Sequence, residues 1–343
     1  QIVARMAEVF GPDPAARAER LWEWQWHQDP RLPTPGYRGI VAEWRGQIIG
    51  NLATIPAGLP IGGVSVTAYW CVDVLMHWGL MRQALRDQRR QVGAGPDFTY
   101  GIAAALLDHP AAGPIQLSKH IADPMMAIIG RIGFQAVPDT CSLQRRVSLR
   151  HTLRRGLGWP VGSMLGAVAN LGLPIGPRPR LPVEVLAGGF DGRFDRLWEA
   201  VRLRYAALGR RDARTLDWRY RQQPDGNYQV LTTGVGERLR GYLVLLTYQH
   251  RGRRRAKIVD LLTLPDDSEA IRALLSGALH WLRSWRAEKV ETFACGKGIV
   301  TLLGSMGFVP PLNKVGQPHP LMVRGLPLAA NGIYVTQGDG DGG

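Results

Sequence analysis

The sequence contains little cysteine and little lysine. Its three cysteines lie far apart without a CxxC or Cys/His metal spacing, so we expect reduced core thiols, no disulfide framework and no metal site. Only five of the 42 basic residues are lysine, and the net charge of +14 is spread along the chain with maxima at 145–155 and 251–257. Neither maximum alternates with aromatic residues, so the composition disfavours nucleic-acid binding and favours anionic small molecules or anionic lipid.

Several sequence signatures of other classes are also missing. No serine nucleophile elbow, Walker loop, HExxH motif or EF-hand loop occurs, which removes support for those enzyme and binding classes. The chain begins at Gln1 with neither a methionine nor a signal-type apolar segment. We therefore expect a trimmed N-terminus or a start inside the gene. The expectation of reduced cysteines favours a cytoplasmic protein, with a peripheral location at the inner membrane as the alternative.

Periodicity and turn signals predict an α/β order of elements. We expect helix over 4–27 with a break at its Gly-Pro-Asp-Pro turn, then a hairpin of strands 39–44 and 47–55. The Pro/Gly-rich stretch 56–63 is expected to be a loop or bulge. Further on we expect a long strand over 64–77, helix over 80–91, a strand over 98–103, and a helix over 124–131 that Gly133 ends.

Four motifs of the first half recur in the same order in the second half. They are Trp24-x-Trp26 with Pro30 and Trp218-x-Tyr220 with Pro224, Gly50 and Gly241, Val72-Asp73 and Val259-Asp260, and Gly130-x-x-Gly133-Phe134 and Gly304-x-x-Gly307-Phe308. Self-similarity of this kind indicates a repeated structural unit. We predict two copies of one α/β unit at 1–148 and 184–325, a linker at 149–183 and a flexible tail at 326–343.

The linker combines a basic start with an uncharged stretch. Arginines cluster at 145–155, and residues 157–173 carry no charge. That stretch is too short and too interrupted by glycine for a membrane span. Two readings stay open, namely a helix packed between the lobes and an interfacial segment that contacts an anionic membrane through 145–180.

The order of elements, with leading helices, a hairpin, a long strand entering a helix and a closing Gly-Phe, resembles the GNAT acyltransferase superfamily. The second copy in particular, with Leu216-Asp-Trp-Arg-Tyr220, Pro224 and Ile258-Val-Asp-Leu-Leu262, resembles bacterial two-domain GNAT-like proteins linked with polysaccharide export. The resemblance implies an α/β (α+β) fold of two tandem GNAT-like lobes. Each would have a mixed, mostly antiparallel central sheet flanked by helices.

The same resemblance implies acetyl-CoA or acyl-CoA as the co-substrate. The backbone of the long strand would hold the pantetheine arm, and the turn after it the pyrophosphate. The cofactor-binding residues would be Val74, Leu75, Met76, Trp78, Gly79 and Leu80. The superfamily's phosphate loop is incomplete here, with a single glycine after His77. The second copy has a proline and two aspartates at 265–267, which remove a donor and repel phosphate, so we expect it to be degenerate.

Three residues are candidates for acyl-transfer chemistry, which needs a proton acceptor, oxyanion donors and an acid. His77 is the candidate base, with a histidine satisfied by local hydrogen bonds as the alternative. Asp73 is a second candidate, although its recurrence as Asp260 favours a structural role. Tyr100, on the strand predicted over 98–103, is the candidate acid, with a core aromatic as the alternative.

The function expected from the resemblance is transfer of an acetyl or longer acyl group from acyl-CoA to an amine of a sugar or amino acid, in polysaccharide or cell-envelope metabolism. A Fem-type aminoacyltransferase, which uses aminoacyl-tRNA, is one alternative. A non-catalytic GNAT-like scaffold or binding protein at the membrane surface is the other. The acceptor, the acyl length and the oligomeric state stay open.

Overall fold

The computed structural model describes residues 1–61, 64–92, 98–119, 121, 123–149, 157–158, 161, 164–165, 168, 179–205, 207–264, 266–311, 320–326 and 333–340. Its contacts divide the chain into two compact units. The first contains Gln1–Val137, Gln222–Asp225 and Pro320–Asn331, and the second contains Pro138–Arg221, Gly226–His319 and Gly332–Gly343. Each unit is therefore assembled from segments distant in sequence, while the boundaries predicted in chain order stay a prediction.

The first unit is built on a sheet with the strand order β1-β2-β3-β4-β13-β5. All its pairs are antiparallel except β3 with β4. The strands are β1 (Gly39–Trp44), β2 (Gln47–Ile61), β3 (Val64–Met76), β4 (Gln116–Ser118), β5 (Gln135–Ala136) and β13 (Met322–Arg324). The helices are α1 (Ile2–Phe10), α2 (Pro12–Trp26), α3 (Trp78–Val92), α4 (Phe98–Asp108), the short 3-10 helix η1 (Pro110–Ala112) and α5 (Asp123–Arg131).

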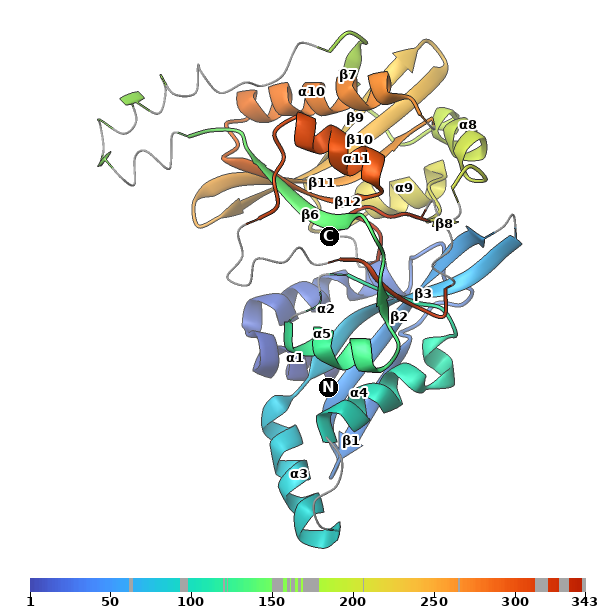
Figure 1. The fold of residues 1–343 in the computed structure, drawn as a ribbon, viewed down its shortest axis with the longest axis vertical. Coiled ribbons are helices and arrows are strands. Elements are labelled where there is room, and N and C mark those ends of the chain that lie inside the picture. Colours follow the sequence, from blue (N-terminus) through green and yellow to red (C-terminus); the bar gives the residue numbers. More distant parts are fainter. Residues whose placement is uncertain are drawn as a thin grey trace. The chain divides into compact units, whose positions relative to one another are not determined.

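Helices cover this sheet on both faces (Figure 1). Met6 of α1 and Ala15 of α2 pack against Leu75 of β3 on one face. On the other face, buried residues of α4 and α5 pack with Leu52 and Met76. Apolar burial on both faces makes the long strand β3 the centre of the unit.

The second unit repeats this plan with the strand order β6-β12-β11-β10-β9-β7. Only β11 with β12 is parallel. The strands are β6 (Thr140–Arg146), β7 (Val183–Val185), β9 (Tyr228–Val235), β10 (Arg238–His250), β11 (Arg253–Thr263) and β12 (Lys289–Cys295), with a separate pair of β8 (Ala207–Leu208) and β14 (Ile333–Tyr334). Helices α8 (Gly192–Val201) and α9 (Ala213–Tyr220) pack on one face, and α10 (Ser268–Ser284) and α11 (Lys297–Ser305) on the other. The predicted mixed, mostly antiparallel sheets flanked by helices are confirmed.

Each unit contains one strand from the other half of the chain. β13 lies between β4 and β5 in the first sheet. In the second sheet β6 pairs with β12 (Figure 1). These strands occupy equivalent places, because each pairs antiparallel to the strand that follows the parallel connection. The correspondence extends to β5, which follows Phe134 and pairs with β13. Val309 follows Phe308 in the same way and forms an antiparallel bridge with Gln144 of β6. The two copies have therefore exchanged one strand.

The repeated Gly-x-x-Gly-Phe motif ends a helix in both copies. Gly133 and Gly307 adopt φ values of 95° and 81°, which favour glycine. The N–H of Phe134 donates to Ile129 O over 3.1 Å, and that of Phe308 donates to Leu303 O over 3.1 Å. This is the Schellman helix end, in which the residue after the glycine returns to the last turn and buries its side chain.

The prediction of a loop over 56–63 was wrong for its first six residues, because β2 continues to Ile61. Pro56 lies opposite Tyr69 of β3, whose N–H is directed to Ile115 O on the other side. The missing N–H of Pro56 is thus directed away from β3, and β1 pairs with β2 only as far as Ala53. At such an edge position a proline removes no ladder bond.

The strand predicted over 98–103 was also wrong, because this segment begins helix α4. Its aromatic start suggested a strand, but the buried residues Ala103, Leu106 and Leu107 recur at helical spacing. They pack into the core on the α5 face of the first sheet. Tertiary burial decided the conformation here.

Candidate functional site

The central strands of the first unit part at β3. The parallel pairing of β3 with β4 comprises Tyr69 with Gln116 and Trp70 with Leu117. Within the described residues, no further β3–β4 pair follows, although β3 continues to Met76. Its last six residues therefore present backbone groups on the side where β4 has separated. Such an edge can pair with an extended ligand that carries amide groups.

A bulge interrupts β3 at the same place. The register with β2 shifts between Asn51 and Ala53, and Asp73 adopts a φ of 49°, which is uncommon for a residue other than glycine. The buried side chain of Asn51 donates from Nδ2 to the Asp73 carbonyl over 2.8 Å. The bulge is thus held by a side chain on the neighbouring strand.

Tyr37 completes a chain of hydrogen bonds behind this bulge. Its hydroxyl donates to Asn51 Oδ1 over 2.9 Å, and its ring stacks on Trp22 with centroids 4.7 Å apart. Burial raises the pKa of Tyr37, and the negative charge of Asp73 raises it further. Tyr37 is therefore a neutral hydrogen-bond donor at physiological pH.

His77 connects β3 to α3 and is held on both ring nitrogens. Its Nδ1 accepts a hydrogen bond from the main-chain N–H of Leu80 over 3.2 Å, so His77 caps the helix. The ring proton of the neutral form is then on Nε2, which lies 3.1 Å from Glu8 Oε2. A carboxylate that holds the second nitrogen orients the ring, as in sites where histidine removes a proton.

Glu8 is a carboxylate at neutral pH. The hydrogen bond from Arg5, 2.6 Å long, is the main cause that lowers the Glu8 pKa, and the one from His77 lowers it further. This places a negative charge from α1 beside the end of the central strand. It is paired there with both Arg5 and His77.

The residues predicted to hold the cofactor divide into buried and exposed positions. Leu75 and Met76 are in the core, so only their backbone groups could contact a ligand. Val74 and Trp78 are exposed at 38% and 42%. Helix α3 begins at Trp78, and the first N–H groups of a helix lack intrahelical acceptors. The N–H of Leu80 donates to His77 Nδ1. The N–H groups of Trp78 and Gly79 are therefore the candidate donors to a ligand.

Tyr100 lies on helix α4 and not on a strand beside β3. Its hydroxyl donates to Arg131 O over 3.5 Å, and the Arg131 guanidinium lies 4.2 Å from its ring centroid. The ring packs against the core on that face of the sheet. The predicted position of Tyr100 on a strand was wrong. Its role as the acid stays a prediction.

The equivalent opening in the second unit is filled by the chain itself. The pairing of β11 with β12 ends at Ile258 with Thr292. Beyond it, Cys295 Sγ donates to Ile333 O over 2.9 Å, and Gly338 N donates to Val259 O over 2.6 Å. The remaining cavity, about 20 Å³, is roughly the space of one water molecule.

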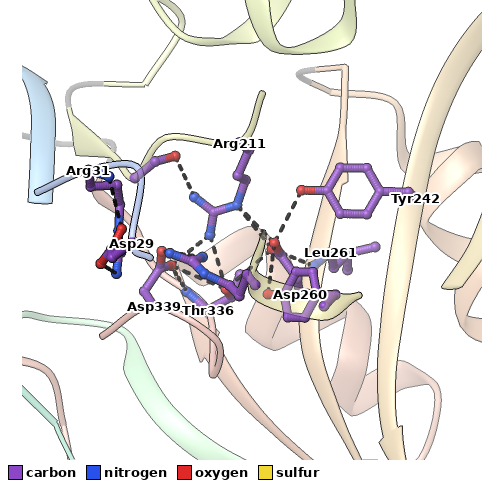
Figure 2. A network of polar contacts seen from close by, with 11 residues as sticks. Asp29, Arg31, Arg211, Tyr242, Asp260, Leu261, Thr336 and Asp339 are labelled. Carbon is purple, nitrogen blue, oxygen red and sulfur yellow. Dashed lines mark hydrogen bonds and ion pairs between the residues drawn. The ribbon is translucent and has the colours of Figure 1, made fainter. Parts of the chain in front are cut away.

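A buried polar network fastens that C-terminal segment (Figure 2). Arg211, fully buried, pairs with Asp260 over 3.0 Å and with Asp339 over 2.6 Å. The hydroxyls of Tyr242 and Tyr220 donate to Asp260 over 3.1 and 3.2 Å. Burial lowers the pKa of Arg211, but the two carboxylates outweigh it and the pKa is raised, so the guanidinium stays charged.

The described residues show neither a metal-binding cluster nor a membrane-spanning helix. They contain no group of three histidine, cysteine or acidic side chains that could hold a metal ion. None of their helices has the length and apolar content needed to cross a membrane.

The chain has the fold of the GCN5-related N-acetyltransferases, and N-myristoyltransferase is also similar in structure. A GCN5-related N-acetyltransferase from Anabaena variabilis aligns with a TM-score of 0.58 at 13% identity, covering 94% of this chain and 69% of that one. Saccharomyces cerevisiae N-myristoyltransferase with bound myristoyl-CoA aligns with a TM-score of 0.56 at 11% identity, covering 90% and 74%. No protein-family model and no curated protein sequence matches the chain.

Proposed function

We propose that the protein transfers an acyl group from acyl-CoA to an amine, and that the first unit carries the activity. The parting of β3 from β4 beside a helix start is the observation that carries this proposal. The similarity to a myristoyl-CoA-bound transferase supports CoA as the carrier. Filling of the equivalent opening by residues 333–336 supports a structural role for the second unit.

Acyl-CoA would bind along β3. The pantetheine amides would pair with the backbone of Val74 to Met76, which β4 leaves uncovered. The pyrophosphate would lie at the start of α3, where the N–H groups of Trp78 and Gly79 and the helix dipole favour negative charge. Gly79 would bring the backbone close, since a methyl there would already lie 3.3 Å from the His77 ring.

In the transfer itself the amine nitrogen attacks the thioester carbonyl carbon, the C–S bond breaks and CoA leaves as the thiol. His77 stays the candidate base and would take the amine proton through water, because its Nδ1 faces the Leu80 N–H at the helix start where the pyrophosphate would lie. Glu8 would hold the Nε2 proton and stabilise the imidazolium. Asp73 and Tyr100 stay candidates for acceptor placement and for protonation of the thiolate.

The proposed acceptor is a small amine. A small amine of a sugar or amino acid would be drawn to the carboxylate of Glu8. The proposed setting is polysaccharide or cell-envelope metabolism in the cytoplasm, with membrane contact through residues 145–180. Most of residues 145–180 lie outside the described residues.

A charge placed at the helix start tests the binding site. Trp78→Glu puts a carboxylate at the first position of α3. The helix dipole stabilises that carboxylate, but its negative charge repels the CoA pyrophosphate. The matched control is Ser268→Glu, at the first position of α10 in the second unit. We expect acyl-CoA affinity to fall about tenfold or more in the first variant and to be unchanged in the second.

Binding is measured by calorimetry and by the melting temperature in acetyl-, octanoyl- and myristoyl-CoA, and turnover by thiol release with a panel of amines. Absence of CoA binding by the unaltered protein contradicts the proposed function. Equal loss in the two variants contradicts the assignment to the first unit.

A further inference from the structure

A basic groove lies at the end of the second unit's sheet where β11 begins. The filled opening lies toward the other end of β11. The groove encloses about 530 Å³, within the range of small-ligand sites. Five cationic side chains and one carboxylate line it. The lining residues from the sheet and the loops beside it are Gln144, Arg145, Arg146, Arg253, Arg255, Glu288, Lys289, Gly307, Val309 and Pro310.

The sheet register places three of these cations side by side. Arg255 of β11 lies opposite Lys289 of β12, and Lys289 lies opposite Arg146 of β6. Residues directly opposite on neighbouring strands are about 5 Å apart and project from the same face. Like charges in such pairs are destabilising, so the fold holds a row of repelling charges across three strands.

Two carboxylates pair with cations of the row and beside it. Glu288 is shared between Arg253 and Arg255, at 3.1 and 3.5 Å. Glu291 pairs with Lys289. Arg145 is 9% exposed, and burial lowers its pKa, so its charged form is held at a cost. A bound anion in the groove would reduce the repulsion along the row of Arg255, Lys289 and Arg146.

We propose that this groove binds the phosphate group of an anionic ligand. Guanidinium forks match phosphate oxygens in pairs, and arginine outnumbers lysine four to one among the lining cations. The phosphate could come from a soluble phosphorylated molecule or from the headgroup of an anionic phospholipid. Nothing in this proposal depends on acyl transfer in the first unit.

The test compares two double variants of the full chain with equal loss of charge. The groove variant, Arg146→Gln with Arg255→Gln, removes two cations of the row. The control variant, Arg251→Gln with Arg254→Gln, removes two cations of the β10–β11 hairpin that do not line the groove. Inorganic pyrophosphate binding is measured by calorimetry at low ionic strength. Vesicles of equal parts phosphatidylcholine and phosphatidylglycerol are used for co-sedimentation.

We expect pyrophosphate to bind the unaltered protein, about tenfold more weakly to the groove variant, and unchanged to the control. Vesicle binding lost in the groove variant and displaced by pyrophosphate would identify the lipid headgroup as the source. Pyrophosphate binding without vesicle binding would identify a soluble ligand. Failure of both probes to bind, or equal weakening in both variants, overturns the proposal.

A second measurement guards against a variant that does not fold. Because substitution relieves repulsion along the row but removes the Arg255–Glu288 pair, the melting temperature of the groove variant without ligand is compared with that of the unaltered protein. If the groove variant is less stable, the single variant Arg146→Gln, at an exposed strand end, replaces it in the binding test. Unchanged pyrophosphate affinity in that single variant then counts against the groove.

Discussion

A histidine that caps a helix needs only an acceptor atom, whereas a histidine that removes a proton also needs a basic nitrogen. His77 satisfies the first requirement through Nδ1 and the Leu80 N–H. Asparagine also caps helices well but is not a base near neutral pH, and alanine does neither. The two substitutions therefore separate the two roles of one residue.

We predict that His77→Asn and His77→Ala each lower the rate of acyl transfer about a hundredfold or more, since general-base catalysis contributes on that scale. Only His77→Ala should also lower the free energy of unfolding, by about 1 kcal/mol for the lost cap. Thiol release with an accepted amine and urea unfolding provide the two readouts. A His77→Asn variant with the unaltered rate would reduce His77 to a cap.

At the residue scale the sequence located the candidate site but not its partners. His77 and Asp73 lie at and near the end of the central strand, where the repeat had placed them. Glu8 was missed because its contact with His77 spans 69 residues of sequence and no local pattern marks it. Tyr37 and Asn51 were missed for a similar reason, since their bond to the bulge depends on the pairing of β2 with β3.

At the scale of elements, the C-terminal segment 333–340 contributes to the core of the second unit as a strand would. Tyr334 packs with the aromatic residues of the α8 and α9 face, and its hydroxyl donates to Leu261 O. Asp339 supplies the second carboxylate for Arg211 and lies 3.6 Å from Arg219. Removing one partner from such a buried pair leaves a charge without full compensation.

We predict that Asp339→Asn lowers the free energy of unfolding by about 3 kcal/mol, because Arg211 and Arg219 are then left with Asp260 alone as a carboxylate. The same change at Asp191, an exposed helix cap paired with Arg193, should alter stability by less than about 0.5 kcal/mol. Urea unfolding at neutral pH measures both. Equal effects at the two positions would show that the network does not hold the segment.

Elements with strong periodicity were predictable, and those set by distant packing were not. The hairpins, the long central strands and the helix ends at Gly133 and Gly307 follow from local sequence. The helix over 98–108 was missed although Ala103, Leu106 and Leu107 recur at helical spacing, whereas their burial against the sheet was not visible in the sequence. Residues 333–336 have the β-branched and aromatic composition of a strand, but they were grouped with a flexible tail because residues 337–343 are rich in glycine and aspartate. That they would fill an opening between β11 and β12 depends on distant packing.

At the scale of the whole molecule, strand exchange makes each unit depend on both halves of the chain. A fragment 1–148 contains β6 without its sheet and lacks β13, an interior strand of its own sheet. A fragment 179–343 keeps β7 but lacks β6 and carries β13 without its neighbours. Unpaired interior strands leave backbone groups and apolar side chains without partners.

We therefore predict that the two fragments do not fold alone but co-purify when expressed together. Val323→Pro in the second fragment should abolish co-purification, since β13 has neighbours on both sides and proline removes a ladder bond there. Val185→Pro, in the edge strand β7 that is not exchanged, should leave it intact. Affinity purification through a tag on one fragment, with circular dichroism of each, tests this. If each fragment alone unfolds cooperatively and the two do not associate, strand exchange is not what the fold depends on.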